Sequence, residues 1–185
     1  MKKEYRNSLR TKRMIREAFA QLIGEKKMIS NISVAELSER ADIAKSTFYN
    51  HYEDIYSVAD EIWQEILDGL NLMIDMMEAD KTNDQRIYIK NIFNFLRQNE
   101  GLYRNLVDSP DAVFFIGKIK HLISERVFTK ITSPALSKNR EERYVQISFL
   151  ADGCVDVLVA YLRGDIDMSF DELENTIMSL LKKFM

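Results

Sequence analysis

The sequence predicts an all-α protein, and three observations support this fold class. Only 6 Gly and 2 Pro occur among 185 residues, so the residues that commonly interrupt helices are scarce. Apolar residues recur at three- and four-residue spacing along most of the chain, as on the buried face of an amphipathic helix. No long stretch alternates apolar and polar residues, so no strand is expected. We therefore expect about nine helices.

The first quarter of the chain is predicted to contain three helices. The first runs from about residue 8 to residue 24, with Ile15 and Phe19 on its apolar face. Ser33 as N-cap and Glu36 three residues later predict a capping box at the start of a second, short helix. Asp42 is expected to form a brief turn, because a short polar side chain tolerates a left-handed backbone conformation. A third helix is expected directly afterwards, at 45–51.

The remaining helices are predicted from the spacing of apolar residues and from residues that typically begin or end a helix. The polar stretch 80–84 interrupts the repeat, 129–139 is expected to be a loop around Pro134, and Pro110 is expected at a first helical position. Gly164 is expected to end one helix, and a second capping box of Ser169 and Glu172 to start the last. The predicted helices are 54–79, 89–96, 102–107, 110–127, 140–163 and 169–184.

The net charge of −3 is unevenly distributed. Residues 1–52 hold 11 Lys or Arg against 6 Asp or Glu, whereas residues 53–185 hold 15 against 23. The surplus of positive charge in the first segment favours contact with a polyanion, although a solvated basic surface explains the charge equally well. We expect two domains, a first at 1–53 and a helical domain at 54–185.

The cysteine and histidine content excludes several kinds of site. Cys154 is the only cysteine, so no intramolecular disulfide forms, and only two histidines occur, so neither a metal site nor a cofactor is predicted. Residues 1–16 lack the apolar run of a signal peptide, and Asp152 and Asp156 interrupt the most apolar helical stretch. The sequence therefore predicts a cytoplasmic protein that does not cross a membrane.

The segment 33–52 has the layout of a helix-turn-helix. Two such short helices need a third to pack on, and the first helix supplies an apolar face. The third helix would present Lys, Ser, Thr, Tyr and Asn side chains, which suit base edges and phosphates in a DNA major groove. A helical hairpin with a polar face, without DNA contact, has the same layout.

The run 11–58, and above all 43–52, resembles the N-terminal DNA-binding domain of the TetR/AcrR family of bacterial transcriptional regulators. An aromatic, any residue, histidine, aromatic sequence, common at the end of the family's third helix, stands here at 49–52. The chain departs from the family where Asp42 replaces a frequent Gly and Ile55 a frequent phosphate-binding Lys. The expected DNA-binding residues are Ser33, Lys45, Ser46, Thr47, Tyr49, Asn50 and His51.

The resemblance implies a dimeric regulator, most members being repressors, that binds double-stranded operator DNA and responds to a small molecule. A seven-residue helix spans only about 10 Å, which also argues for two copies reading two half-sites. The expected homodimer contacts are Cys154, Val157, Tyr161, Ile177 and Leu181. The expected effector-binding residues are Trp63, Leu67, Phe93, Phe115 and Phe149, although core packing is the favoured explanation for apolar side chains of this kind.

Two other classes of function remain open at this point. A helical adaptor that has lost DNA binding is compatible with the acidic Glu53 and Asp54 and with the missing Lys. An all-α enzyme would have to use Asp152 and Asp156, which share one helix face, but the sequence contains none of the common catalytic motifs.

Overall fold

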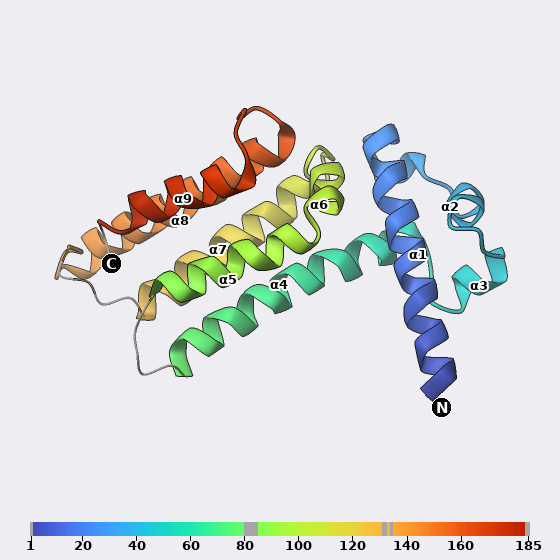
Figure 1. The fold of residues 1–185 in the computed structure, drawn as a ribbon, viewed down its shortest axis with the longest axis horizontal. Coiled ribbons are helices and arrows are strands. Elements are labelled where there is room, and N and C mark those ends of the chain that lie inside the picture. The colour runs from blue at the N-terminus through green and yellow to red at the C-terminus, as the bar shows by residue number, and fades with distance from the viewer. Residues whose placement is uncertain (1, 80–84, 131–132, 134, 184–185) are drawn as a thin grey trace. The chain divides into compact units, whose positions relative to one another are not determined.

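The computed structural model describes residues 2–79, 85–130, 133 and 135–183, and its regular structure over these ranges is entirely helical (Figure 1). The all-α prediction is confirmed. The expected interruption at 80–84 and Pro134 lie outside the described residues. The helices are α1 Lys2–Lys26, the short 3-10 helix η1 Ile29–Asn31, α2 Val34–Arg40, α3 Lys45–Tyr49, α4 Ile55–Ala79, α5 Gln85–Gln98, α6 Glu100–Val107, α7 Ala112–Lys130, α8 Arg140–Arg163 and α9 Phe170–Leu181.

The chain divides into two compact units. The first, which we call the head, comprises Met1–Ile66 and Gly101–Val113, and the second, the body, comprises Leu67–Glu100 and Phe114–Met185. The long helix α4 contributes its first half to the head and its second half to the body. The expected domain boundary between residues 53 and 54 stays a prediction. In the structure the head also includes the later segment Gly101–Val113.

The core of the head joins its first three helices. Helix α1 packs against α2, and α2 packs against α3. Phe19 and Leu22 of α1, Leu37 of α2 and Phe48 of α3 are fully buried. Short helices such as α2 and α3 are marginal on their own, so this shared apolar contact is what stabilises them.

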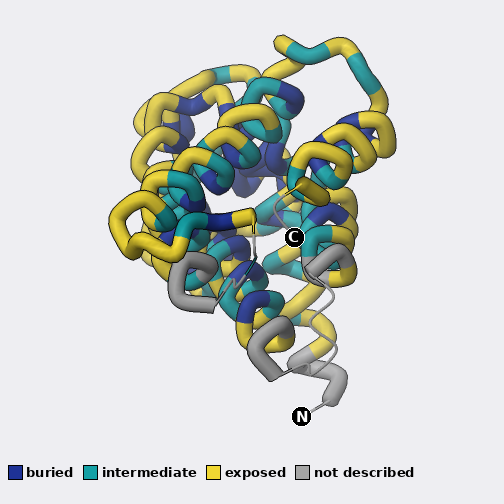
Figure 2. Tube along the Cα trace, turned by 90° about the vertical axis from the view of Figure 1, so that its left-hand side faces the viewer, coloured by how far each residue is buried: buried dark blue, intermediate teal, exposed yellow. Residues whose placement is uncertain are grey.

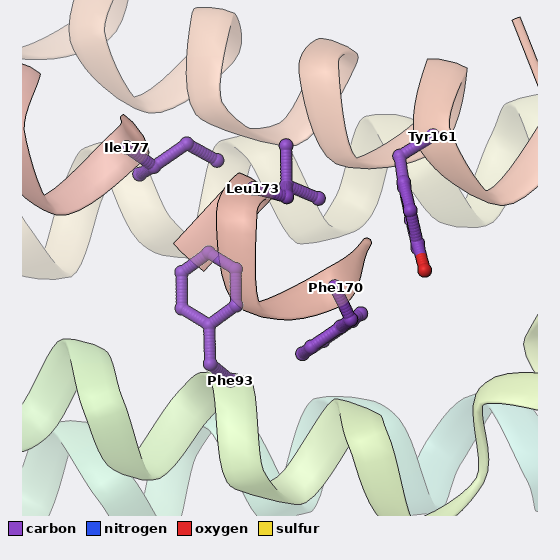
Figure 3. Close-up of a cluster of buried hydrophobic side chains, with 5 residues drawn as sticks. All are labelled: Phe93, Tyr161, Phe170, Leu173 and Ile177. Carbon is purple, nitrogen blue, oxygen red and sulfur yellow. The ribbon is translucent and has the colours of Figure 1, made fainter. Parts of the chain in front are cut away.

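The core of the body is centred on aromatic residues from α5, α8 and α9 (Figure 3). The ring of Phe170 lies 5.6 Å from that of Phe93 and 5.6 Å from that of Tyr161, both in edge-to-face geometry. The guanidinium of Arg97 lies 4.8 Å from the Phe170 ring centre. We call this set the α5–α9 cluster: Phe93, Tyr161, Phe170, Leu173 and Ile177.

Several predicted helix ends are confirmed. Ser169 and Glu172 form the reciprocal capping box of α9. Gly164 follows α8 with a φ of +85°, the left-handed conformation that glycine adopts without steric cost. Ser33 accepts a hydrogen bond from the Glu36 backbone N–H at 3.2 Å, so the N-cap of α2 is also confirmed.

Several predicted helix starts differ from those in the structure; α5, for example, begins at Gln85 rather than near residue 89. Helix α1 begins at Lys2 rather than near residue 8, because polar residues continue a helix that apolar spacing does not mark. Helix α7 begins at Ala112, not at Pro110. The Ser109 hydroxyl accepts a hydrogen bond from the Asp111 N–H at 3.3 Å, which forms a turn that includes the proline.

Buried and exposed residues alternate along the helices, as expected of amphipathic packing (Figure 2). Helix α8 differs, because it carries exposed apolar side chains. Val145 is 66% exposed and Phe149 is 78% exposed. By length and composition alone, α8 is also long and apolar enough to cross a membrane, and only 22% of its most apolar window is buried inside this chain.

Candidate nucleic-acid interface

Helix α3 is fixed in place by Phe48, whose side chain is fully buried beneath it. The Phe48 ring centre lies 5.5 Å from that of Tyr49 and 5.8 Å from that of Tyr52. Because Phe48 points inward, its neighbours in this five-residue helix are directed outward. One buried aromatic side chain therefore orients the whole polar face of α3.

The predicted DNA-binding residues lie on or beside this outer face. Lys45, Ser46, Tyr49 and Asn50 are exposed, whereas Thr47 and His51 are half-buried. Tyr49 is 58% exposed, which is high for an aromatic residue next to a core. The structure thus brings six of the seven residues together, and the seventh, Ser33, is exposed at the start of α2, where its hydroxyl also caps that helix.

The turn between α2 and α3 depends on a left-handed residue. Asp42 has a φ of +54° at the position where glycine is frequent in related domains. The Ile43 N–H donates to the Ser38 carbonyl at 3.0 Å and closes the turn. Aspartate therefore reproduces the tight connection that a helix-turn-helix requires.

The end of the α3 segment is tied to both α1 and α4. The Tyr52 hydroxyl donates to Glu61 Oε1 at 3.0 Å, and Lys12 Nζ lies 2.6 Å from Glu61 Oε2. The Lys12 ammonium also lies 5.3 Å from the centre of the Tyr52 ring. Burial, together with the Glu61 charge, raises the pKa of Tyr52 well above its ordinary value. Sequence reasoning missed Glu61, because its partners are distant along the chain.

Ion pairs also connect α2 to the C-terminal end of α1. Lys26 Nζ lies 2.9 Å from Glu36 Oε1. Arg40 binds Glu25 through two hydrogen bonds of 2.8 and 3.0 Å. This pairing lowers the pKa of Glu25 and raises that of Arg40. The Arg40–Glu25 pair is exposed, so it contributes orientation more than stability, whereas Lys26 and Glu36 are half-buried.

The start of α4 lacks the cation that is frequent there in the TetR/AcrR family. Ile55 is 6% exposed and packs into the head. Asp54 caps the helix, since Ser57 donates its backbone N–H and its hydroxyl to Asp54 Oδ1, each at 2.8 Å. These hydrogen bonds lower the pKa of Asp54. The exposed surface at this point is therefore acidic, with Glu53 and Asp54 side by side.

The segment around α6 completes the head beside the end of α1. Lys27 Nζ lies 3.1 Å from Asp108 Oδ2. A Cβ atom added at Gly24 would lie 2.8 Å from Asn105 Oδ1, so the two helices approach closely there. The middle of α1, at Lys12, contacts Tyr52 after α3 instead. Helix α1 therefore contacts the α6 segment near its C-terminal end and the residue after α3 near its middle.

The expected effector-binding residues occupy different environments. Trp63 and Phe93 are buried, and Leu67 and Phe115 are half-buried. Phe93 packs in the α5–α9 cluster, where its ring contacts Phe170. Phe149 is 78% exposed and does not line an internal site of this chain. Trp63 belongs to the head and the other four residues to the body, where they differ widely in exposure.

The expected dimer contacts also differ in exposure. Tyr161 and Ile177 are 5% and 4% exposed and belong to the chain's own α5–α9 cluster, against which Cys154 and Leu181 pack. Val157 alone among the five is exposed. All five are apolar residues of amphipathic helices, and their spacing alone does not say which face meets the chain's own core. The dimer contacts stay a prediction.

The paired aspartates of α8 have a cationic neighbour. Lys120 Nζ lies 2.6 Å from Asp156 Oδ1, a partner from α7 that the sequence did not indicate. Asp152 is half-buried. Within the described part of the chain, no group of three or more His, Cys, Asp or Glu side chains is arranged to hold a metal ion.

Comparison with known proteins defines the class to which this fold and helix-turn-helix belong. Residues 83–183 match the TetR-type family model described as the transcriptional regulator C-terminal region. The chain belongs to the TetR family of transcriptional regulators, whose members are not enzymes, so the enzyme alternative is excluded.

Individual relatives agree with this assignment. An uncharacterized HTH-type transcriptional regulator of Haemophilus influenzae is 28% identical over 174 residues, which cover 87% of this chain and 80% of the relative. A TetR transcriptional regulator from Streptococcus agalactiae shares the fold with a TM-score of 0.55 and 21% identity, covering 96% and 97% of the two chains. The dihydroxyacetone kinase operon activator DhaS matches with a TM-score of 0.53 and 20% identity over 93% and 94%.

Proposed function

We propose that this regulator is a cytoplasmic homodimer that binds a double-stranded DNA operator sequence-specifically through α3, and that it represses transcription until a small molecule binds the body. The observation that carries DNA binding is the geometry of α3. Its polar side chains are exposed on a helix that a fully buried Phe48 holds in place. A rigid polar helix of this kind fits the major groove.

The side chains of α3 suit distinct parts of a DNA duplex. Lys45 presents an ammonium donor that matches guanine O6 and N7, and Asn50 presents the donor and acceptor pair that matches adenine. Ser46 and Thr47 hydroxyls bind bases or phosphates. The exposed ring of Tyr49 contributes an apolar surface for a thymine methyl group and a hydroxyl for phosphate.

Dimerisation is supported by the exposed apolar face of α8. Val145, Phe149, Gly153 and Val157 follow one another at four-residue spacing and therefore share one face. A Cβ added at Gly153 would meet no atom within 4 Å in this chain, so this face is open along its centre. Leu180 of α9 is 56% exposed as well. We therefore replace Tyr161 and Ile177 by Val145 and Phe149 in the proposed interface.

Relief of repression requires that an effector stabilises a body conformation in which the two α3 helices are wrongly spaced for the operator. Such a ligand acts through its difference in affinity for the two conformations. The half-buried Leu67 and Phe115 are the candidate contacts, because a ligand reaches them with less repacking than it needs at the buried Phe93. DhaS is named as an operon activator, so the sign of regulation needs its own test.

The experiment is a footprint on the DNA that flanks the gene, followed by titration of the protected site. We expect protection of two half-sites about 34 Å apart, and we expect Lys45→Ala to weaken operator binding at least tenfold. The control is Lys138→Ala, which removes an exposed lysine from the body. Equal affinity for operator and random DNA would refute specific binding and favour a helical adaptor. A reporter gene behind the operator then shows repression or activation.

A further inference from the structure

Two ion pairs join α1 to the head half of α4 on successive helix turns. Lys12 Nζ lies 2.6 Å from Glu61 Oε2, and Arg16 binds both carboxylate oxygens of Glu65. The two cations are four residues apart on α1, and the two carboxylates are four residues apart on α4. As ion pairs, they therefore repeat the same connection between the same two helices.

The two carboxylates differ in what else they bind. The second oxygen of Glu61 accepts a 3.0 Å hydrogen bond from the Tyr52 hydroxyl, whereas both oxygens of Glu65 bind Arg16. Tyr52 is 5% exposed, and a hydroxyl in such a place is costly to leave without a partner. Glu61 is itself half-buried, whereas Glu65 is exposed. Glu61 therefore holds Tyr52 in addition to joining the helices.

Tyr52 is packed directly on the residue that anchors α3. Its backbone N–H donates to the Phe48 carbonyl at 3.0 Å, and its ring centre lies 5.8 Å from that of Phe48. The Lys12 ammonium lies 5.3 Å from the centre of the Tyr52 ring. Because Phe48 is the buried residue of this five-residue helix, a displaced Tyr52 removes one of the contacts that set the direction of α3.

From these contacts we infer that Glu61 is a positioning residue for α3: by binding Tyr52 and Lys12 together, it fixes the direction in which α3 presents its side chains to operator DNA. The operator part of this inference rests on the proposed function. Hydrogen bonds to base edges require exact geometry, whereas attraction to phosphates depends mainly on charge. A reoriented α3 therefore loses affinity for the operator and keeps its affinity for random DNA.

The first test compares Glu61→Ala with Glu65→Ala, which removes the same charge from the same helix. Fluorescence anisotropy measures binding to operator and to random duplex DNA, well below the melting temperature of each variant. Loss of either carboxylate strengthens attraction to all DNA alike, so this effect cancels in the ratio of the two affinities. We expect Glu61→Ala to lower the operator-to-random ratio by at least about fivefold, and Glu65→Ala to change it by less than about twofold.

Two further variants separate positioning from a general loss of structure. Glu61→Gln keeps an oxygen that accepts the Tyr52 hydroxyl, so it should restore most of the ratio. Tyr52→Phe removes the same hydrogen bond from the other side and should lower the ratio even if Glu61→Ala does not fold. Adding Glu61→Ala to Tyr52→Phe should then lower it little further. An unchanged ratio in Tyr52→Phe, or an equal fall in Glu65→Ala, would overturn the inference.

Amide hydrogen exchange gives a readout that needs no DNA. The backbone N–H groups of Asn50, His51 and Tyr52 donate to carbonyl groups of α3. We expect them to exchange at least about fivefold faster in Glu61→Ala than in Glu65→Ala, with residues 15–23 of α1 unchanged. Equal exchange in the two variants would overturn the inference. Faster exchange in a protein whose wild type binds operator and random DNA equally would refute the proposed function alone.

Discussion

The hydroxyl of Tyr52 donates a 3.0 Å hydrogen bond to the carboxylate of Glu61 and so joins the segment that follows α3 to α4. The other oxygen of the same carboxylate binds Lys12 of α1. Helices α1 and α4 and the segment that follows α3 thus meet at the Glu61 side chain. The orientation of α3 therefore depends on a polar contact as well as on the buried Phe48.

Tyr52→Phe tests this contact, because it removes the hydroxyl and keeps the ring. We expect the free energy of unfolding to fall by about 1 kcal/mol, since Glu61 loses one hydrogen bond but keeps its Lys12 partner. Urea unfolding followed by circular dichroism measures the change. The control is Tyr56→Phe, which alters a 51% exposed tyrosine of the same helix region and should leave stability unchanged. Equal effects in the two variants would contradict a specific role for Tyr52.

Gly164→Ala tests the left-handed end of α8. A φ of +85° disfavours any residue with a Cβ, so we expect a loss of about 1 kcal/mol in the free energy of unfolding. Gly117→Ala in α7 is the control, because a Cβ there meets no atom within 4 Å and should stabilise the helix by up to about 1 kcal/mol. The two substitutions should thus shift thermal unfolding in opposite directions. A stabilised Gly164→Ala would show that this backbone position relaxes without strain.

Phe149→Asp tests the apolar face of α8 as the dimer interface. Its side chain is 78% exposed in the single chain, so we expect the folded protomer to survive while the dimer dissociates. Sedimentation velocity measures the mass, and circular dichroism checks the fold. Phe114→Asp is the control, because Phe114 is 65% exposed on α7, outside the proposed interface. If wild type sediments as a monomer, or Phe149→Asp as a dimer, the proposed interface is wrong.

Glu172→Gln tests the pH dependence of the α9 cap. The Ser169 N–H and hydroxyl bind the ionised carboxylate and lower the pKa of Glu172 in the folded chain. The unfolded chain therefore binds the proton more readily, and the stabilising contribution is present above the ordinary glutamate pKa. It disappears as pH falls through the lowered folded pKa.

We therefore expect wild type to be more stable than Glu172→Gln at pH 7 and the difference to shrink towards pH 3, as measured by urea unfolding. Glu125→Gln, which changes an exposed glutamate on α7, should give no such pH-dependent difference. A constant difference between wild type and Glu172→Gln over this range would show that the carboxylate charge does not stabilise the cap.

The sequence predicted the ends of helices more accurately than it predicted which residues pack against each other. Ser169, Gly164 and Ser33 act on backbone groups within a few residues, so their roles are visible in the sequence. The length of α1 was underestimated, because none of the side chains described before Ile15 is buried. A helix without an apolar face leaves little periodicity to detect.

Tertiary partners could not be read from spacing. Phe149 and Tyr161 are both aromatic residues of α8, yet one is exposed and the other is buried. Which of them meets α9 depends on the rotation of α8 about its axis, which its neighbours set. The outer face of α3 was predicted more fully, since the inward position of Phe48 fixes the remaining directions in so short a helix.

The return of residues 101–113 to the first compact unit has a practical consequence for protein engineering. A chimera that grafts residues 1–66 onto a foreign C-terminal domain would discard Asn105 and Asp108, the neighbours of Gly24 and Lys27. The donor would then have to provide a compatible α6 surface. Modular exchange within this family is therefore constrained by a segment that no single cut in the chain can separate.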